Sequence, residues 1–190
     1  MEPGTVISRE AALSLLRQHV KNENMLKHCL ASEAVLKAMA RKLGEDEAKW
    51  GLAGLLHDID VEMTNGDPAV HGSKAAELLR PAGVPEDVIE AIRMHNEMSS
   101  GARRTERFHH ALAAGETVTG LVTATTLVYP DKKLASVKPT SVVKRMKEKL
   151  FAASVNRDVI RECETVGIPL PDFAVLAVEA MRGISADLGL

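Results

Sequence analysis

Glycine, proline, asparagine and aspartate residues divide this chain into segments of helical length joined by short connections. Gly44 stands where one segment should end, because glycine adopts the left-handed conformation of a helix C-terminus without strain. Asn65-Gly66 predicts a turn within an irregular stretch. The predicted helices occupy about residues 8–20, 24–43, 45–56, 68–79, 85–95, 105–128, 141–150, 157–166 and 172–188. The sequence therefore predicts an all-α fold.

The composition also favours packed helices. Aromatic residues make up only 3% of the chain, while apolar residues make up 45%, so the core must be aliphatic. A β-sandwich normally shows more aromatic and β-branched alternation. The segment 105–128 is rich in threonine and valine, so propensity alone allows a strand there. Its length and its alanines favour a buried helix instead.

The chain has the length of one domain with a substantial core. We expect a single domain over residues 1–190, with a core at about 20–130 and a C-terminal helical extension at about 131–190. The amphipathic segment 172–188 belongs to this extension. The sequence leaves open whether that segment packs on the body or forms a homodimer contact.

Charge, cysteine content and hydropathy limit the partners. The formal net charge of −2 argues against a general nucleic-acid-binding surface, although it leaves room for a local basic pocket. Cys29 and Cys163 lack the spacing of a disulfide framework or a thiolate zinc site. No apolar run approaches the roughly 20 residues of a membrane helix, and the first residues lack the features of a signal peptide. We therefore expect a cytoplasmic protein with no membrane partner.

Histidines and carboxylates stand on the apolar faces of several predicted helices. His28, His57 and His95 each adjoin an apolar stripe, Asp58 follows one, and Glu116 lies in a run without other charges. Each residue alone is more often an ordinary hydrogen-bonded core group. Together they have one shared explanation, because a divalent metal offsets buried carboxylates and satisfies imidazole nitrogens. Mixed nitrogen and oxygen ligands suit Mn, Fe, Co, Ni or Zn, so we expect one or two such ions per chain.

The order of these residues resembles a known signature. His28, the pair His57-Asp58 and a late acidic residue resemble the H…HD…D pattern of the HD superfamily of metal-dependent phosphohydrolases. Leu-Leu-His-Asp-Ile at 55–59 is similar to the central motif of that superfamily. Segments 71–76 and 92–96 are similar to its further histidine segments.

This similarity covers most of the chain. It runs from about residue 28 to residue 128, and the stretch 130–157 resembles one small subgroup. The resemblance implies the HD-domain helical bundle with additional C-terminal helices.

The resemblance also implies roles for individual residues. It implies a first metal held by His28, His57, Asp58 and Glu116. Asp58 would then bridge to a second metal bound by His71 and His95; with a single metal, those two histidines would line the substrate pocket. His57 and Asp58 are the catalytic candidates. Lys74 and Asn96 are the substrate-binding candidates, since Lys74 lies one helical turn after His71 and can meet an anion.

The sequence departs from the family pattern at two places. Glu116 stands where the family has its final aspartate, and the extra methylene changes the reach of a ligand. Asp60 and Val61 stand where many relatives have Gly-Lys, so the phosphate-holding lysine of those relatives is absent. His109 and His110 match no family ligand, and we expect both to be solvated.

Three functions remain open at this point. The first is hydrolysis of a small, anionic, phosphate-containing substrate (a phosphomonoester, a phosphodiester or a nucleotide) through a metal-activated water. The second is oxygen chemistry at a diiron centre, which some HD proteins with similar ligands perform. The third is a non-catalytic helical module with a degenerate metal site, which the Glu116 departure favours. Family frequency favours the hydrolase.

Overall fold

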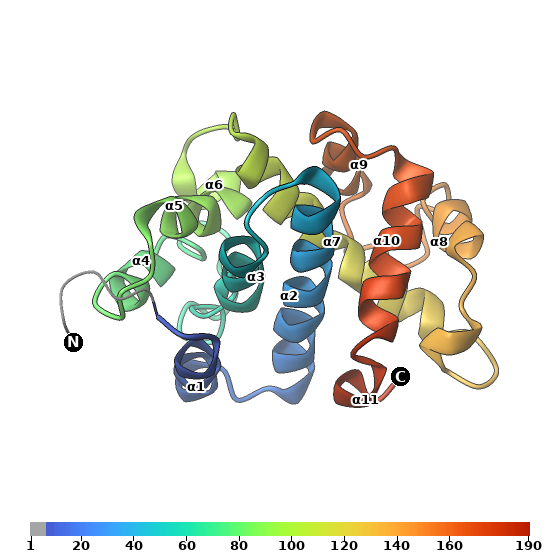
Figure 1. Cartoon of the computed structure of the whole chain (residues 1–190), viewed down its shortest axis with the longest axis horizontal. Helices are drawn as coiled ribbons and strands as arrows, with labels where there is room; N and C mark the ends of the chain where they lie inside the picture. The colour runs from blue at the N-terminus through green and yellow to red at the C-terminus, as the bar shows by residue number, and fades with distance from the viewer. Residues whose placement is uncertain (1–6) are drawn as a thin grey trace.

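The computed structural model describes residues 7–190, and within this range every regular element is helical. The predicted all-α fold is therefore confirmed (Figure 1). The longer helices are α1 (Arg9–His19), α2 (Glu23–Leu43), α3 (Glu47–Leu56), α5 (Glu86–His95), α7 (Arg107–Leu127), α9 (Arg157–Thr165) and α10 (Leu170–Arg182). Short helices are α4 (Ala75–Leu79), α6 (Glu97–Ser100), α8 (Pro139–Arg145), α11 (Ser185–Leu188) and the 3-10 turn η1 (Leu134–Ser136).

The ends of the N-terminal helices follow from capping chemistry. The side chain of Asn22 accepts hydrogen bonds from the first backbone amides of α2, and Asp46 does the same for α3. Such caps satisfy amides that have no partner inside the helix. Gly44 ends α2 in the left-handed conformation with φ +73°, as its position in the sequence predicts.

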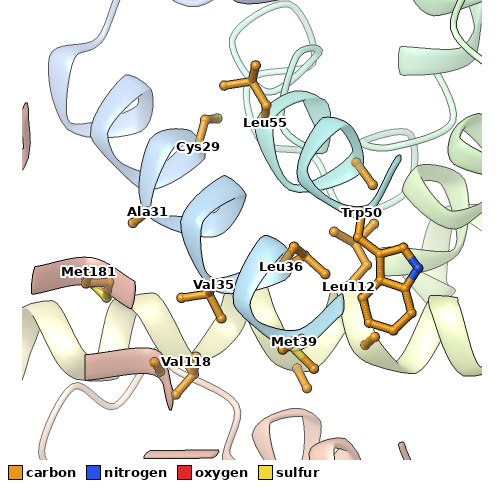
Figure 2. Close-up of a cluster of buried hydrophobic side chains, with 14 of the residues drawn as sticks. Cys29, Ala31, Val35, Leu36, Met39, Trp50, Leu55, Leu112, Val118 and Met181 are labelled. Carbon is orange, nitrogen blue, oxygen red and sulfur yellow. The ribbon is translucent and has the colours of Figure 1, made fainter. Parts of the chain in front are cut away.

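Helix α2 is the central helix of the bundle. It packs against α3 on one side and α10 on the other, with α7 crossing behind it (Figure 1). Val35, Leu36 and Met39 of α2 are fully buried, and they point towards α3 and α7 (Figure 2). Burial of one such side chain contributes about 1.5–3 kcal/mol relative to exposure. The aliphatic core therefore fixes the relative positions of the helices that carry the site.

Two glycines allow unusually close contacts with α2. A Cβ on Gly54 of α3 would lie 2.7 Å from the backbone oxygen of Ser32. A Cβ on Gly115 of α7 would overlap a methyl carbon of Leu36. A larger residue at position 54 would push α3 away from the backbone of α2, and one at position 115 would displace the Leu36 side chain from the core. Both glycines thus contribute to the spacing of the helices that hold the histidines.

The C-terminal helices cover α2 and α7. Helix α10 packs on α2 and α9 packs on α7, so the extension lies against the body (Figure 1). Phe173, Ala177 and Met181 on the inner face of α10 are fully buried. The amphipathic segment 172–188 therefore packs within its own chain over its length, as α10 and α11. None of the helices in residues 7–190 has both the length and the apolar character of a membrane span.

Two predicted helices are shorter than expected. The segment 68–79 was predicted to be one helix after Pro68, but residues 67–74 form successive turns and α4 begins only at Ala75. The reason is local: Gly72 takes φ +90°, which no α-helix accommodates. The segment 141–150 likewise ends as a helix at Arg145 and continues as turns.

Candidate metal centre

Asp58 lies between two pairs of histidines that come from different parts of the fold. His28 projects from α2, His57 and Asp58 directly follow α3, His71 lies in the turns before α4, and His95 ends α5. One carboxylate oxygen, Oδ2 of Asp58, lies 3.5 Å from His28 Nε2 and 3.4 Å from His57 Nε2. The other oxygen, Oδ1, lies 3.0 Å from His71 Nε2 and 3.7 Å from His95 Nε2. The two oxygens therefore face two separate histidine pairs.

Within each pair the two imidazoles are in direct contact through Nε2. His28 Nε2 lies 3.0 Å from His57 Nε2, and His71 Nε2 lies 3.1 Å from His95 Nε2. The rings meet edge to face, with interplanar angles of 70° and 83°. All four Nε2 atoms thus converge on the one carboxylate.

The opposite nitrogen of each ring has a fixed partner. His57 Nδ1 lies 2.8 Å from the carbonyl of Gly54, and His95 Nδ1 lies 2.5 Å from the carbonyl of Ile92. A carbonyl only accepts, so Nδ1 carries the proton in both rings. A neutral ring with its proton on Nδ1 presents a bare lone pair at Nε2. The backbone therefore selects the tautomer that a metal ligand requires.

His28 and His71 are held by side chains. Thr119 Oγ1 donates to the carbonyl of Glu116 and lies 2.9 Å from His28 Nδ1, so its free lone pair accepts from this ring. His71 Nδ1 donates to Oδ1 of Asp60 at 2.8 Å. Asp60 is fully buried, and its Oδ2 also accepts the backbone N–H groups of Gly72 and Ala75. Asp60 thus orients His71 and fixes the turn that carries it.

The donor set fits a divalent metal. His28, His57 and Asp58 each offer a ligand atom within 4.8 Å of the others, and so do Asp58, His71 and His95. With Nδ1 protonated in two neutral rings, the contact between His28 Nε2 and His57 Nε2 brings two lone pairs together, which is unfavourable unless a proton or a metal ion lies between them. Imidazole nitrogens and a carboxylate suit first-row transition metals. The described residues therefore contain two groups that could hold a metal, with Asp58 common to both.

Burial and neighbouring charges set the protonation states of the metal-free centre. Burial lowers the pKa of His57 and of His95 to about 4, and it also lowers the pKa of His28. Burial acts to raise the pKa of Asp58, but the surrounding histidines hold it well below its usual range. Burial acts to lower the pKa of His71, yet hydrogen bonds to Asp58 and Asp60 raise it to about 10. Three neutral rings thus surround an ionised carboxylate.

Glu116 lies at the edge of this centre. Its Oε2 is 3.7 Å from His28 Nε2, and its side chain borders a cavity of about 340 Å³ together with His28 and His95. Burial raises the pKa of Glu116 to about 8. Glu116 belongs to neither of the two three-residue groups above. The structure thus places it beside His28 and facing the open side of the centre.

The two substrate-binding candidates have different surroundings. Lys74 is exposed at the start of α4, and its ammonium lies 2.7 Å from Oε1 of Glu77. The side-chain amide of Asn96 donates to the carbonyls of Pro68 and His71, at 2.8 and 2.9 Å. Asn96 therefore ties the end of α5 to the turn that carries His71. Neither residue borders the cavity beside His28 and His95.

The expectation that His109 and His110 are solvated is wrong. His109 is buried, with 8% of its surface exposed, because it lies on the inner face of α7. His110 is half-buried, and its Nδ1 lies 2.6 Å from Oε2 of Glu162 on α9. Because α7 is covered by α2 and α9, few of its side chains are exposed to solvent.

Sequence reasoning missed the residues that hold the histidines. It treated Asp60 only as a departure from the family motif, and it gave Thr119 and Arg104 no role. The guanidinium of Arg104 donates to the carbonyls of Met94 and His95, both at 3.1 Å, and to Glu162. One signal in the sequence pointed to Asp60, which is a second carboxylate two residues after Asp58 in an otherwise apolar stretch.

Together these features define a class of protein: an all-α bundle with four histidines and an aspartate arranged for divalent metals. The sequence model of the HD domain matches residues 25–133, which is more than half of the chain. The chain belongs to the HD domain family. HD domains bind divalent metals, and the family is one of metal-dependent phosphohydrolases.

Curated relatives match the chain over part of its length. The chain is 34% identical over 76 residues to Ribonuclease Y of Oleidesulfovibrio alaskensis, a match that covers 40% of this chain and 15% of the relative. It is 33% identical over 101 residues to Ribonuclease Y of Thermus thermophilus, covering 51% of this chain and 18% of that protein. The match thus spans less than one fifth of either relative. No solved structure matches the chain significantly.

Proposed function

We propose that this protein is a metal-dependent phosphohydrolase that acts on a small phosphate ester. The observation that carries this proposal is the position of Asp58, whose two oxygens face two histidine pairs. Such an arrangement suits two metal ions bridged by one carboxylate. We propose His28, His57 and Asp58, with Glu116, as ligands of one ion. We propose Asp58, His71 and His95 as ligands of the other.

When bound, divalent ions at these positions would polarise a phosphoryl oxygen and make water more acidic. Residues of the chain orient the proposed ligands for this chemistry. Four Nδ1 contacts fix the ring tautomers, and the apolar core behind His57 excludes water from that side. Glu116, His28 and His95 border the open side, so a substrate phosphate would reach the ions from the cavity there.

A small substrate fits this chain better than RNA. The relatives are named ribonucleases, but the match covers only a fraction of each. The net charge of −2 gives no general phosphate-binding surface. The cavity of about 340 Å³ beside His28 and His95 has the size of a small-molecule site. We therefore propose a phosphomonoester, a small phosphodiester or a nucleotide.

The test combines metal content with hydrolysis. Protein purified without chelator should contain one or two divalent ions per chain by elemental analysis. Added Mn, Co or Ni should stimulate hydrolysis of p-nitrophenyl phosphate or bis-p-nitrophenyl phosphate. His57→Ala and Asp58→Ala should abolish this activity, while His19→Ala, a matched control on α1, should retain it.

Other outcomes are equally decisive. Metal-dependent turnover that survives both His57→Ala and Asp58→Ala would refute the proposal. Two irons per chain, oxygen consumption and no hydrolysis of any ester would assign the same ligands to oxygen chemistry. Faster cleavage of an RNA oligonucleotide than of the small esters would overturn the substrate class.

A further inference from the structure

A second cavity continues from the metal centre along α2 and α7. It has a volume of about 560 Å³ and is bordered by His28 and Thr119 near the centre and by Leu188 and Leu190 at the far end. His28, Gly120, Ser154 and Val155 border both this cavity and the smaller one beside Glu116. The two cavities therefore adjoin each other, and the space they form together is the cleft. The residues at its far end belong to α11 and the two positions after it, and α11 lies beside the first turns of α2 (Figure 1).

One wall of this cleft consists of residues with small side chains or none. Ala31, Gly120 and Ala124 line it with small side chains from α2 and α7. The opposite wall is the loop at 152–155, which Arg157 holds by donating to the carbonyls of Ala152 and Val155 at 2.6 and 2.5 Å. The loop is thus fixed by its own chain, and the cleft is preformed.

One cation stands on the wall of the cleft. Lys27 precedes His28 on α2, and its Nζ lies 3.2 Å from the point where a Cβ on Gly189 would be. Within residues 7–190, its ammonium makes no ion pair closer than 4.0 Å and no hydrogen bond to protein. Four other lysines of the described residues are in ion pairs, namely Lys37, Lys42, Lys49 and Lys74. An ammonium without a protein partner in a cleft is suited to bind an anionic group of a ligand.

Apart from Lys27 and His28, the side chains that border the larger cavity are uncharged. Polar groups come from Asn24, Thr119, Thr123 and Ser154. Apolar contacts come from Leu127, Val155, Leu188 and Leu190. No carboxylate side chain borders this cavity. A ligand that spans the cleft therefore meets metal ligands at one end, uncharged groups in the middle and the Lys27 ammonium beside them.

We propose that the cleft binds the organic part of the substrate and that Lys27 binds a second anionic group on it. The substrate class is then a phosphate ester whose neutral organic part carries a further phosphate or carboxylate. This inference rests on the proposed function and adds the feature by which substrates are selected. Lys27 is a specificity residue in this assignment, and Gly120, which borders both cavities, gives their common wall a position without a side chain.

The first test compares ligands with one and two anionic groups. The probes are hexylphosphonate, 6-phosphonohexanoate and hexane-1,6-bisphosphonate, titrated into Mn-loaded protein by calorimetry. We expect the two doubly anionic probes to bind about tenfold more tightly than hexylphosphonate, because one charge-assisted hydrogen bond is gained. Lys27→Gln should remove this preference. Lys21→Gln, which makes the same charge change on the connection before α2, should keep it.

The outcomes separate this inference from the proposed reaction. If the wild type does not bind the doubly anionic probes more tightly than hexylphosphonate, the role of Lys27 is overturned. The same holds if this preference survives Lys27→Gln. A preference for the bisphosphonate alone selects a second phosphate, and a preference for both probes admits a carboxylate. Hydrolysis of p-nitrophenyl phosphate is measured in parallel. If hydrolysis is present without the preference, only the cleft assignment fails; if it is absent and the preference holds, only the reaction fails.

The second test uses the wall that the two cavities share. Gly120 borders both cavities, and a Cβ there would lie 3.2 Å from Cγ2 of Val155, so Gly120→Val adds bulk where the cavities adjoin. Valine replaces glycine in a helix without loss of helix propensity. We expect hexylphosphonate to bind at least fivefold more weakly to Gly120→Val, while methylphosphonate binds as it does to the wild type. Equal binding of hexylphosphonate to both proteins would show that the organic part lies elsewhere.

Discussion

The Oδ1 atom of Asp60 accepts a hydrogen bond from His71 Nδ1 at 2.8 Å, and this contact turns the opposite nitrogen of the ring towards Asp58. The second oxygen of Asp60 accepts two backbone N–H groups. Carboxylates behind a metal-binding histidine typically change metal affinity 10–100-fold when they are removed. A residue that departs from the phosphate-binding motif thus supports the metal centre.

Asp60→Asn tests this role. Asparagine has a single acceptor oxygen and an N–H₂ group that only donates, so it cannot accept all three hydrogen bonds and His71 should lose its fixed orientation. We expect the affinity for the ion at Asp58, His71 and His95 to fall at least tenfold, while the ion at His28 and His57 is retained. Elemental analysis after dialysis against limiting metal would show a fall in stoichiometry. Asp67→Asn, which preserves a side-chain acceptor for Ala69 N, should bind metal normally.

Gly72 and Gly66 form a matched pair for a second prediction. Both have positive φ, +90° and +64°, so alanine is strained at either position. A Cβ on Gly72 would lie 3.2 Å from Cε1 of His95, whereas a Cβ on Gly66 would contact nothing within 4 Å.

We expect both alanine variants to lose about 1 kcal/mol of unfolding free energy in urea. Only Gly72→Ala should also weaken metal binding, because its methyl group displaces the His95 ring. Isothermal titration of the metal-free proteins with Mn would measure this difference. Equal metal affinity in the two variants would show that the contact between Gly72 and His95 has no role in the centre.

Much of the fold could be predicted because the residues at helix ends have characteristic types. Asn22, Gly44 and Asp46 mark helix boundaries with local chemistry, and α2 and α3 begin and end within two residues of the prediction. The course of the segment before α4 was harder to predict. Its course depends on Asp60 accepting amides from residues 72 and 75, a contact that no local pattern in the sequence specifies.

The site likewise has features that the sequence shows and features that only the fold determines. His28, His57, Asp58, His71 and His95 could be recognised because their residue types and order are visible in the sequence. The partners of their Nδ1 atoms could not, since the carbonyls of Gly54 and Ile92 are backbone atoms present at every position. What makes them partners is the end of a helix, where carbonyls lack an intrahelical donor.

Arg104 provides a third prediction, on the link between the C-terminal helices and the centre. Its side chain is 7% exposed and joins Glu162 of α9 to the last carbonyls of α5, including that of His95. Arg104→Gln should lower the unfolding free energy by about 3 kcal/mol, because the partly buried Glu162 loses its cationic partner and keeps only His110. Arg161→Gln removes an exposed pair with Glu164 and should change it by less than about 1 kcal/mol. Urea denaturation of both variants measures the difference; equal losses would contradict the proposed link.

A fourth prediction concerns acid stability and the ion pairs of Glu33. Its side chain is only 5% exposed and is bonded to Arg9 Nε at 2.6 Å and to Lys37 Nζ at 2.5 Å. Burial acts to raise the pKa of Glu33, but these two cations hold it below its ordinary value. The unfolded chain therefore takes up a proton at this group at higher pH than the folded chain does.

The sign of the effect follows from this shift. The stabilisation due to Glu33 is complete above the unfolded pKa of about 4.3 and is lost as the pH falls through the lower folded value. The difference in unfolding free energy between wild type and Glu33→Gln should thus be largest at pH 6–7 and shrink below about pH 4. Urea titrations at several pH values with a chelator present measure it without metal linkage. Glu47→Gln, at an exposed pair with Arg41, should differ from wild type by no more than about 1 kcal/mol. A wild-type advantage over Glu33→Gln that stays constant down to pH 3 would show that Glu33 titrates alike in both states.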